Sequence, residues 1–114
     1  VAAGVAFSLV RFLRKSSVWL VVEFDVQDEA SWRAAMLPLI KASRKEPGNL
    51  RYVMHRPCHP ASSLAAPDTK RYTLIEEFES EGALDAHNAS DHFKKYAAVL
   101  GQAANITITK LRPL

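Results

Sequence analysis

The chain has 114 residues, of which 48% are hydrophobic and 24% charged, and its formal net charge is +3. This length gives room for one compact domain and excludes a two-domain organisation. The basic residues are scattered in pairs such as Arg14–Lys15 and Lys94–Lys95, whereas a nucleic-acid interface needs clustered charge with stacking aromatic residues. We therefore expect no nucleic-acid partner. The single cysteine, Cys58, excludes an intramolecular disulfide and fits a reducing compartment.

Residues 1–17 are expected to form an N-terminal extension in front of a domain at 18–114. The extension contains no acidic residue, and its apolar run is far shorter than the roughly 20 residues that cross a bilayer. Its positive charges follow the apolar run, which is the reverse of a secretory signal. We expect a cytoplasmic protein with no membrane partner. A short amphipathic helix, a docked extension and an organellar transit peptide all stay open for 1–17.

The first part of the domain predicts a strand followed by a helix. The stretch 18–26, VWLVVEFDV, has apolar residues at both its odd and its even positions, which is typical of a strand buried on both faces. Asp28 or its neighbour then caps a helix that runs to about Arg44. The turn EPGN ends it, and Gly48 is expected to supply a positive φ there.

Three further strands and a broken helix complete the pattern. The alternating stretch 50–56 predicts the second strand, and a proline- and serine-rich loop at 57–68 separates it from a third strand at 70–79. Ser80 is a good N-cap for a helix, and Ser90 with Asp91 starts a second short helix that is expected to end at Gly101. The last strand is predicted at residues 105–111.

The predicted order is β-α-β-β-α-β, which defines an α+β, ferredoxin-like domain with an antiparallel four-stranded sheet. Its helices lie on one side, so one sheet face stays uncovered. That face is not polar, and a soluble monomer rarely exposes a large apolar patch. We therefore predict a homodimer through the open sheet face. The apolar residues counted toward this surplus are Trp19, Val21, Val53, Ile75, Ile106 and Ile108.

Two groups of side chains suggest metal or nucleophile chemistry, and neither has suitable spacing. His87 and His92 are five residues apart, which separates them by about 140° on one helix, whereas helical metal pairs are four apart. The break at Ser90 is expected to send them in different directions. The stretch HRPCH at 55–59 lacks a second pair of ligands, and Cys58 with the adjacent His59 has no recognisable oxyanion motif. We expect no metal site.

A pocket between the sheet and the helices is the remaining candidate site. On the third strand, Glu76 shares a face with Tyr72, Leu74 and Phe78, so a carboxylate lies among apolar neighbours. His87 lies on the apolar side of its helix and could face it. Glu76 could be the structural partner of a buried donor, and His87 could be a packing histidine. The alternative is a catalytic Glu76–His87 acid/base pair in an apolar pocket.

The stretches EPGNLRY and RYTLIEEFESEGALDAHNASDHFKKY resemble the antibiotic biosynthesis monooxygenase family of dimeric α+β barrels. The likeness runs from about Trp19 to Leu111. It rests on the Glu-Pro-Gly turn before the second strand, on Glu76 with an aromatic residue two positions later, and on Ala83, His87 and His92-Phe93. The resemblance implies the dimeric barrel fold but not one reaction, because the family includes quinol and polyketide monooxygenases, an isomerase and haem degraders.

The resemblance implies a small-molecule substrate and no cofactor. Monooxygenase members deprotonate an electron-rich quinol or polyketide in a dry pocket, which needs neither flavin nor metal. An isomerase branch enolises a phosphorylated dione with an acid/base pair, and a non-catalytic binding or stress-response protein is the third alternative. Haem degraders match poorly, since their Asn, Trp and His positions hold Val22, Phe78 and Ala97. Glu76 or His87 would be the base, and the substrate-binding wall would comprise Val22, Phe24, Tyr72, Phe78, His92, Phe93 and Tyr96.

Overall fold

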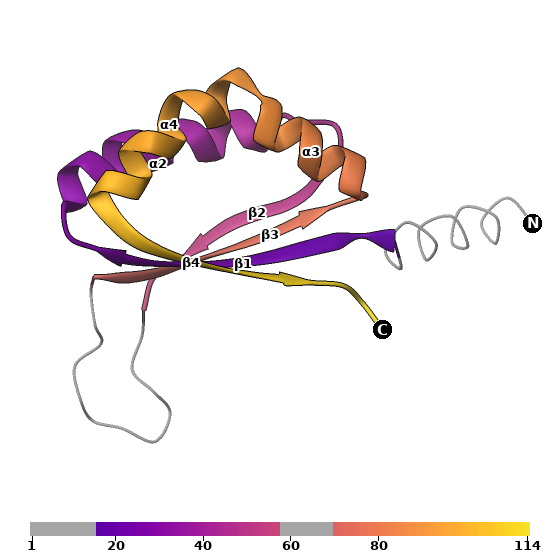
Figure 1. The fold of residues 1–114 in the computed structure, drawn as a ribbon, viewed down its shortest axis with the longest axis horizontal. Helices are drawn as coiled ribbons and strands as arrows, with labels where there is room; N and C mark the ends of the chain where they lie inside the picture. Colours follow the sequence, from indigo (N-terminus) through magenta and orange to yellow (C-terminus); the bar gives the residue numbers. More distant parts are fainter. Residues whose placement is uncertain (1–15, 58–69) are drawn as a thin grey trace, which may run out of the picture.

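A computed structural model describes residues 16–57 and 70–114. They form a four-stranded sheet with the order β2-β3-β1-β4, and every neighbouring pair of strands is antiparallel. The helices all lie on one face of this sheet (Figure 1). The predicted α+β, ferredoxin-like β-α-β-β-α-β order is confirmed. The elements are β1 (Val18–Val26), α2 (Glu29–Ser43), β2 (Asn49–His55), β3 (Arg71–Phe78), α3 (Glu81–Ala89), α4 (Asp91–Ala103) and β4 (Ala104–Leu111).

Side-chain caps begin the helices where the sequence predicts them. Asp28 accepts a hydrogen bond from the Ser31 amide at 3.1 Å and so starts α2. Ser80 accepts one from the Ala83 amide at 3.1 Å and starts α3. Each cap satisfies one of the amides that the first turn of a helix leaves without an intrahelical partner. Local sequence therefore fixes where both helices enter the layer above the sheet.

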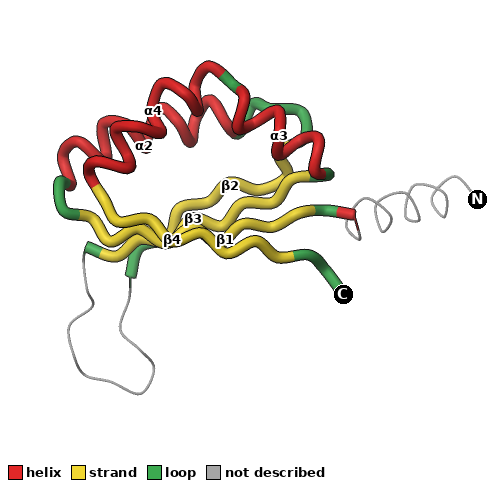
Figure 2. The backbone as a smooth tube through the Cα atoms, viewed as in Figure 1, coloured by secondary structure: helices red, strands yellow, loops and turns green. Residues whose placement is uncertain are grey.

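Ser90 separates α3 from α4, which succeed each other in the helical layer (Figure 2). Its backbone is extended, with φ −68° and ψ 152°, so the helix cannot continue through it. Its hydroxyl donates to the carbonyl of His87 at 2.6 Å and accepts from the amide of Phe93 at 3.2 Å. The same side chain thus closes one helix and opens the next, as predicted.

Two glycines have roles other than the predicted ones. No residue in the described ranges has a positive φ, so the expected left-handed conformation of Gly48 is wrong. A Cβ atom on Gly48 would lie 2.5 Å from the Cβ of Ala83. Gly48 is therefore required because α3 packs directly against this turn. Gly101 does not end α4, which continues to Ala103.

The hydrophobic core lies between the sheet and the helices. Alternate residues of the central strands β1 and β3 point toward the helices and are buried, while the residues between them face the opposite side. The aromatic rings of Phe24 and Trp32 meet edge to face, with centroids 5.5 Å apart. The largest buried contributions come from Val22, Phe24, Leu74 and Phe78 of the sheet and from Trp32, Met36, Leu39 and Leu100 of the helices.

Only some of the apolar residues that we expected on the uncovered face of the sheet lie there. Trp19, Val21, Val53 and Ile75 lie on it and are half-buried within the single chain. Ile106 and Ile108 were assigned to this face wrongly, because they pair with Phe24 and Val22 across the sheet and share their helix-facing side. They are nevertheless 38% and 61% exposed, since β4 is an edge strand.

Two sequence expectations fall largely on residues outside the described ranges. These are the fate of residues 1–17 and the role of the loop at 57–68. Among the helices of the described ranges, none is long and apolar enough to cross a bilayer.

The contact at Gly48 predicts opposite effects for two glycine-to-alanine substitutions. Gly48→Ala should lower the free energy of unfolding by about 1–3 kcal/mol, because the new methyl group overlaps the backbone-anchored methyl of Ala83. Gly101→Ala should raise it by roughly 0.5–1 kcal/mol, because this position is helical and has no atom within 4 Å of the added Cβ. Urea unfolding measures both. Equal effects of the two substitutions would contradict the close approach of α3 to the turn.

Candidate functional site

A cavity of about 120 Å³ lies between the sheet and the helices. Its lining is mainly apolar, and the polar side chains in it are Tyr52, Glu76, His87 and Asn88. The cavity is open to solvent at a rim. The exposed residues Ile106 and Ile108 form part of that rim. The remaining lining residues are Leu20, Val22, Phe24, Met36, Leu39, Leu74, Phe93, Ala97 and Leu100.

Glu76 is a buried acid in the middle of the sheet. It lies on the central strand β3 between Leu74 and Phe78 on the helix-facing side, and it is only 4% exposed. Within the described ranges its Oε1 atom has no hydrogen-bond partner. Burial, and secondarily the negative charge of Glu46, raise the pKa of Glu76 to about 8. At neutral pH the folded protein therefore keeps this carboxyl group mostly protonated.

His87 connects the buried acid to a second carboxyl group. It lies in the last turn of α3 and is 2% exposed. Its Nδ1 atom is 3.0 and 2.9 Å from the two oxygens of Glu46, and its Nε2 atom is 4.0 Å from Glu76 Oε1. Burial lowers the pKa of His87, against the opposing effect of the hydrogen bond to Glu46. The imidazole is therefore preferentially neutral.

Aromatic side chains hold the His87 ring in place. Its centroid lies 5.1 Å from those of Phe78 and Phe93 and 5.5 Å from that of Tyr52. Burial, with the charge of Glu76 adding to it, raises the pKa of Tyr52, so its hydroxyl stays protonated. The ring of His87 is thus enclosed by aromatic groups on several sides, and its two nitrogen atoms point to the two carboxyl groups.

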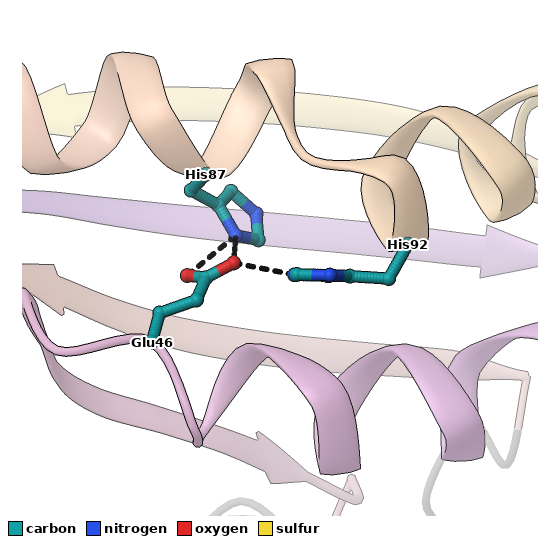
Figure 3. A group of neighbouring side chains, drawn as sticks. All are labelled: Glu46, His87 and His92. Carbon is teal, nitrogen blue, oxygen red and sulfur yellow. Dashed lines mark hydrogen bonds and ion pairs between the residues drawn. The ribbon is translucent and has the colours of Figure 1, made fainter.

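His87 and His92 converge on Glu46, as Figure 3 shows. His92 Nε2 is 2.5 Å from Glu46 Oε2, and the two imidazole centroids are 6.1 Å apart. The expectation that the two histidines point in different directions is therefore wrong. The separation of about 140° between His87 and His92 applies only if both lie on one continuous helix. The break at Ser90 changes the direction of α4, so that His92 lies near the end of α3.

Glu46 was missed by the sequence reasoning. It follows α2 in the turn that leads to β2, where its carbonyl accepts from the Asn49 amide at 3.1 Å. The side-chain amide of Asn49 in turn donates to the carbonyl of Ser43 at 3.0 Å and so ties the turn to the end of α2. The Glu-Pro-Gly motif contains the residue, but it indicates a turn and the family resemblance and assigns no role to the glutamate side chain. The contact with α3 and α4 spans 41 and 46 positions, which no local pattern reports.

The structure places only some of the predicted substrate-binding residues in the lining of the cavity. Val22, Phe24 and Phe93 line the cavity with Glu76 and His87. Phe78 packs against the His87 ring outside the lining, and Tyr96 is half-buried against the core. The sequence reasoning did not select Tyr52 or Asn88, which also line the cavity.

Tyr72 lies elsewhere, although strand parity grouped it with Glu76. Its ring stacks on Trp32 with centroids 4.4 Å apart, and its hydroxyl donates to Glu29 at 2.8 Å. It borders a separate, open hollow of about 360 Å³ between α2 and the β2–β3 side of the sheet. Tyr72 shares the face of β3 with Glu76, but it is near the other end of the strand and cannot touch a molecule in the smaller cavity.

The group of Glu46, His87 and His92 has the composition of a metal site. One ligand atom from each residue lies within 4.8 Å of the other two, and two imidazoles with one carboxylate can bind zinc or iron. However, both imidazoles already make hydrogen bonds to the carboxylate. These bonds satisfy the polar atoms that face one another, so the arrangement is accounted for by hydrogen bonding within the cluster.

Comparisons with known proteins agree with this fold and chain organisation. The family model described as antibiotic biosynthesis monooxygenase matches residues 17–99. The solved structure of Rv0793 from Mycobacterium tuberculosis is 27% identical, with a TM-score of 0.74, and the match covers 87% of this chain and 96% of that one. A conserved protein from Methanosarcina mazei is 24% identical, with a TM-score of 0.76 and coverage of 91% and 99%.

SnoaB from Streptomyces nogalater, described as a cofactor-independent oxygenase, has a TM-score of 0.71 at 16% identity, with 86% and 93% of the two chains covered. At this identity the likeness shows the fold alone. No curated protein matches the sequence. The fold defines a small α+β, ferredoxin-like domain. The chain belongs to the antibiotic biosynthesis monooxygenase family, as the match over most of its length shows.

Proposed function

We propose that the protein is a cofactor-independent monooxygenase for a small quinol-like or polyketide-like substrate. The observation that carries this proposal is Glu76, a buried carboxyl group in a mainly apolar cavity, whose Oε1 atom has no hydrogen-bond partner within the described residues. A buried polar group of this kind costs stability, and such groups concentrate where they perform chemistry. The family membership and the small, mainly apolar cavity support the same conclusion.

The reaction requires a base, an electron-rich substrate and molecular oxygen. The Glu76–His87 pair removes a proton from the substrate, and the resulting anion passes electrons to O₂. On a polyketide-like substrate, one oxygen atom becomes the carbonyl of an activated methylene group, and the other leaves as water with the two hydrogens of that group. On a quinol, one oxygen atom enters as a ring hydroxyl group of the hydroxyquinone product, and the other leaves as water with the two hydrogens that the substrate loses. The apolar lining from Val22, Phe24 and Phe93 excludes bulk water from the anion. In this account the substrate supplies all the electrons that O₂ accepts, so no further redox group is needed.

Two alternatives predict different behaviour. An isomerase for a phosphorylated dione would use the same pair for enolisation, but among the described residues the cavity lining contains no lysine or arginine to receive a phosphate. A non-catalytic binding protein would need the cavity, but it would not need a raised pKa of Glu76. The lining therefore favours the monooxygenase over the isomerase, and the buried carboxyl group of Glu76 favours an enzyme over a binding protein.

The base role of Glu76 predicts a large loss of activity in Glu76→Gln. With a menadiol-like quinol, oxygen uptake should give a kcat/KM at least about 100-fold below that of the unsubstituted protein, because general-base catalysis contributes that much. The kcat/KM of the unsubstituted protein should rise as the pH increases through about 8, since the carboxyl group then loses its proton. Asp85→Asn on the exposed side of α3 is the control.

Oxygen dependence separates the alternatives in the same assay. Undiminished uptake by Glu76→Gln would contradict the base role. Anaerobic turnover of a phosphorylated dione would establish the isomerase, and absence of turnover with both substrate classes would favour the binding protein.

We also propose that two copies associate through the uncovered sheet face. Support comes from the half-buried apolar side chains Trp19, Val21, Val53 and Ile75, which share this face. Leu111 pairs with Trp19 at the edge and is 48% exposed. Joining two such faces would remove a continuous apolar surface from water.

A charge in this face should separate the copies. Ile75→Lys should sediment as a monomer at micromolar concentration, whereas the unsubstituted chain should sediment as a dimer. The matched control is Val99→Lys on α4, a position that is already 39% exposed on the helical side and should leave the dimer intact. A monomeric unsubstituted chain would refute the interface.

A further inference from the structure

We propose that Glu46 and His92 are positioning residues that hold His87 as the Nδ1–H tautomer, with its unprotonated Nε2 turned toward Glu76. This inference deepens the proposed function, on which its catalytic meaning rests. The four side chains come from four different segments: β3 carries Glu76, α3 carries His87, α4 carries His92, and the turn after α2 carries Glu46. Their convergence is a property of the fold rather than of any local sequence.

The tautomer follows from the donor and acceptor properties of the two groups. A carboxylate only accepts hydrogen bonds, and both oxygens of Glu46 lie within 3.0 Å of His87 Nδ1. The proton must therefore be on Nδ1. A neutral imidazole carries one ring proton, and burial lowers the pKa of His87 and favours that neutral state. Nε2 is left with a lone pair.

That lone pair faces the acid of the cavity. His87 Nε2 is 4.0 Å from Glu76 Oε1, an atom with no other hydrogen-bond partner in the described part of the chain. A movement of about 1 Å would bring the two into hydrogen-bond range. The protonated carboxyl group of Glu76 can then donate to Nε2. After the Glu76 carboxylate has accepted the substrate proton, that proton can pass from Oε1 to Nε2.

Glu46 also compensates for the charge created by this transfer. When Nε2 gains the proton, His87 becomes an imidazolium, and the Glu46 carboxylate already lies against its Nδ1–H at 2.9 Å. An acid that orients a histidine and stabilises its cation has the same role in Ser-His-Asp hydrolases. The other titratable groups around His87 are His92 from α4 and Tyr52 from β2.

His92 fixes the position of Glu46 from the solvent side. Its side chain is 25% exposed, that of Glu46 is 17% exposed and that of His87 is 2% exposed. The series Glu76, His87, Glu46, His92 therefore leads from the cavity to the surface. By occupying Oε2, His92 keeps the Glu46 carboxylate turned toward His87 instead of toward water.

Nuclear magnetic resonance of the histidine ring nitrogens tests the tautomer directly. In the ¹⁵N-labelled full chain without substrate, His87 should show a protonated Nδ1 and an unprotonated Nε2. In Glu46→Ala the Nε2–H form should become the major one, because Nδ1 has lost its acceptor. Glu46→Gln keeps the volume and an acceptor oxygen, so it should fold and retain part of the Nδ1–H form. His55→Gln, which removes an exposed histidine, assigns the spectrum and is the control.

Kinetics then separate positioning from mere structural support. Glu46→Ala should lower kcat at least tenfold with little change in KM, Glu46→Gln should recover part of it, and His92→Gln should show a smaller loss than Glu46→Ala. A protonated Nε2 in the unsubstituted chain, an unchanged tautomer in Glu46→Ala, or a stoichiometric metal ion on Nδ1 would overturn the proposal. If the tautomer is as expected but no substrate is oxidised, the proposed function fails and the assignment of Glu46 stands.

Discussion

The site depends on one unfavourable constraint, which is the burial of the Glu76 carboxyl group in the centre of the sheet. β3 is a central strand, so Glu76 is shielded by sheet neighbours on both sides and by the helical layer above. Removing a charge from water in this way costs far more than leaving the group neutral. The protein resolves the conflict by a raised pKa, to about 8, instead of by an ion pair. The neutral acid is then available for proton transfer close to physiological pH.

The helical layer positions the side chains that surround Glu76. The break at Ser90 directs His87 and His92 to one carboxylate, and the absence of a side chain on Gly48 lets α3 approach the turn that carries it. Neither feature is needed for a four-stranded sheet with two covering helices. Both are needed to place an imidazole between a buried acid and a half-buried one. The part of the cavity lining that the structure describes is mainly apolar and contains no lysine or arginine.

Much of the fold could be predicted from the sequence, because its signals are local. The strand at Val18–Val26 and the caps Asp28, Ser80 and Ser90 are encoded within a few residues of where they act. Strand parity also placed Glu76 correctly toward the helices. Parity does not report position along a strand, which is why Tyr72 was grouped with Glu76 although it borders another hollow.

The remaining errors share a physical cause. Glu46 meets its histidines across more than 40 positions, the direction of α4 depends on packing after the break, and the face of Ile106 and Ile108 depends on register with β1. Each is decided by contacts between elements, which a single sequence does not display. Gly48 shows the same limit, since its neighbour Ala83 belongs to another element.

The state of Glu76 can be measured without knowledge of the substrate. A carbon-13 NMR titration of the side-chain carboxyl group in the folded chain, assigned with Glu76→Gln, reports its protonation directly. The account predicts a midpoint near 8, with the carboxyl group still protonated at neutral pH. A midpoint near the ordinary value of 4.5 would show that the group is solvated or paired, and it would contradict the central claim.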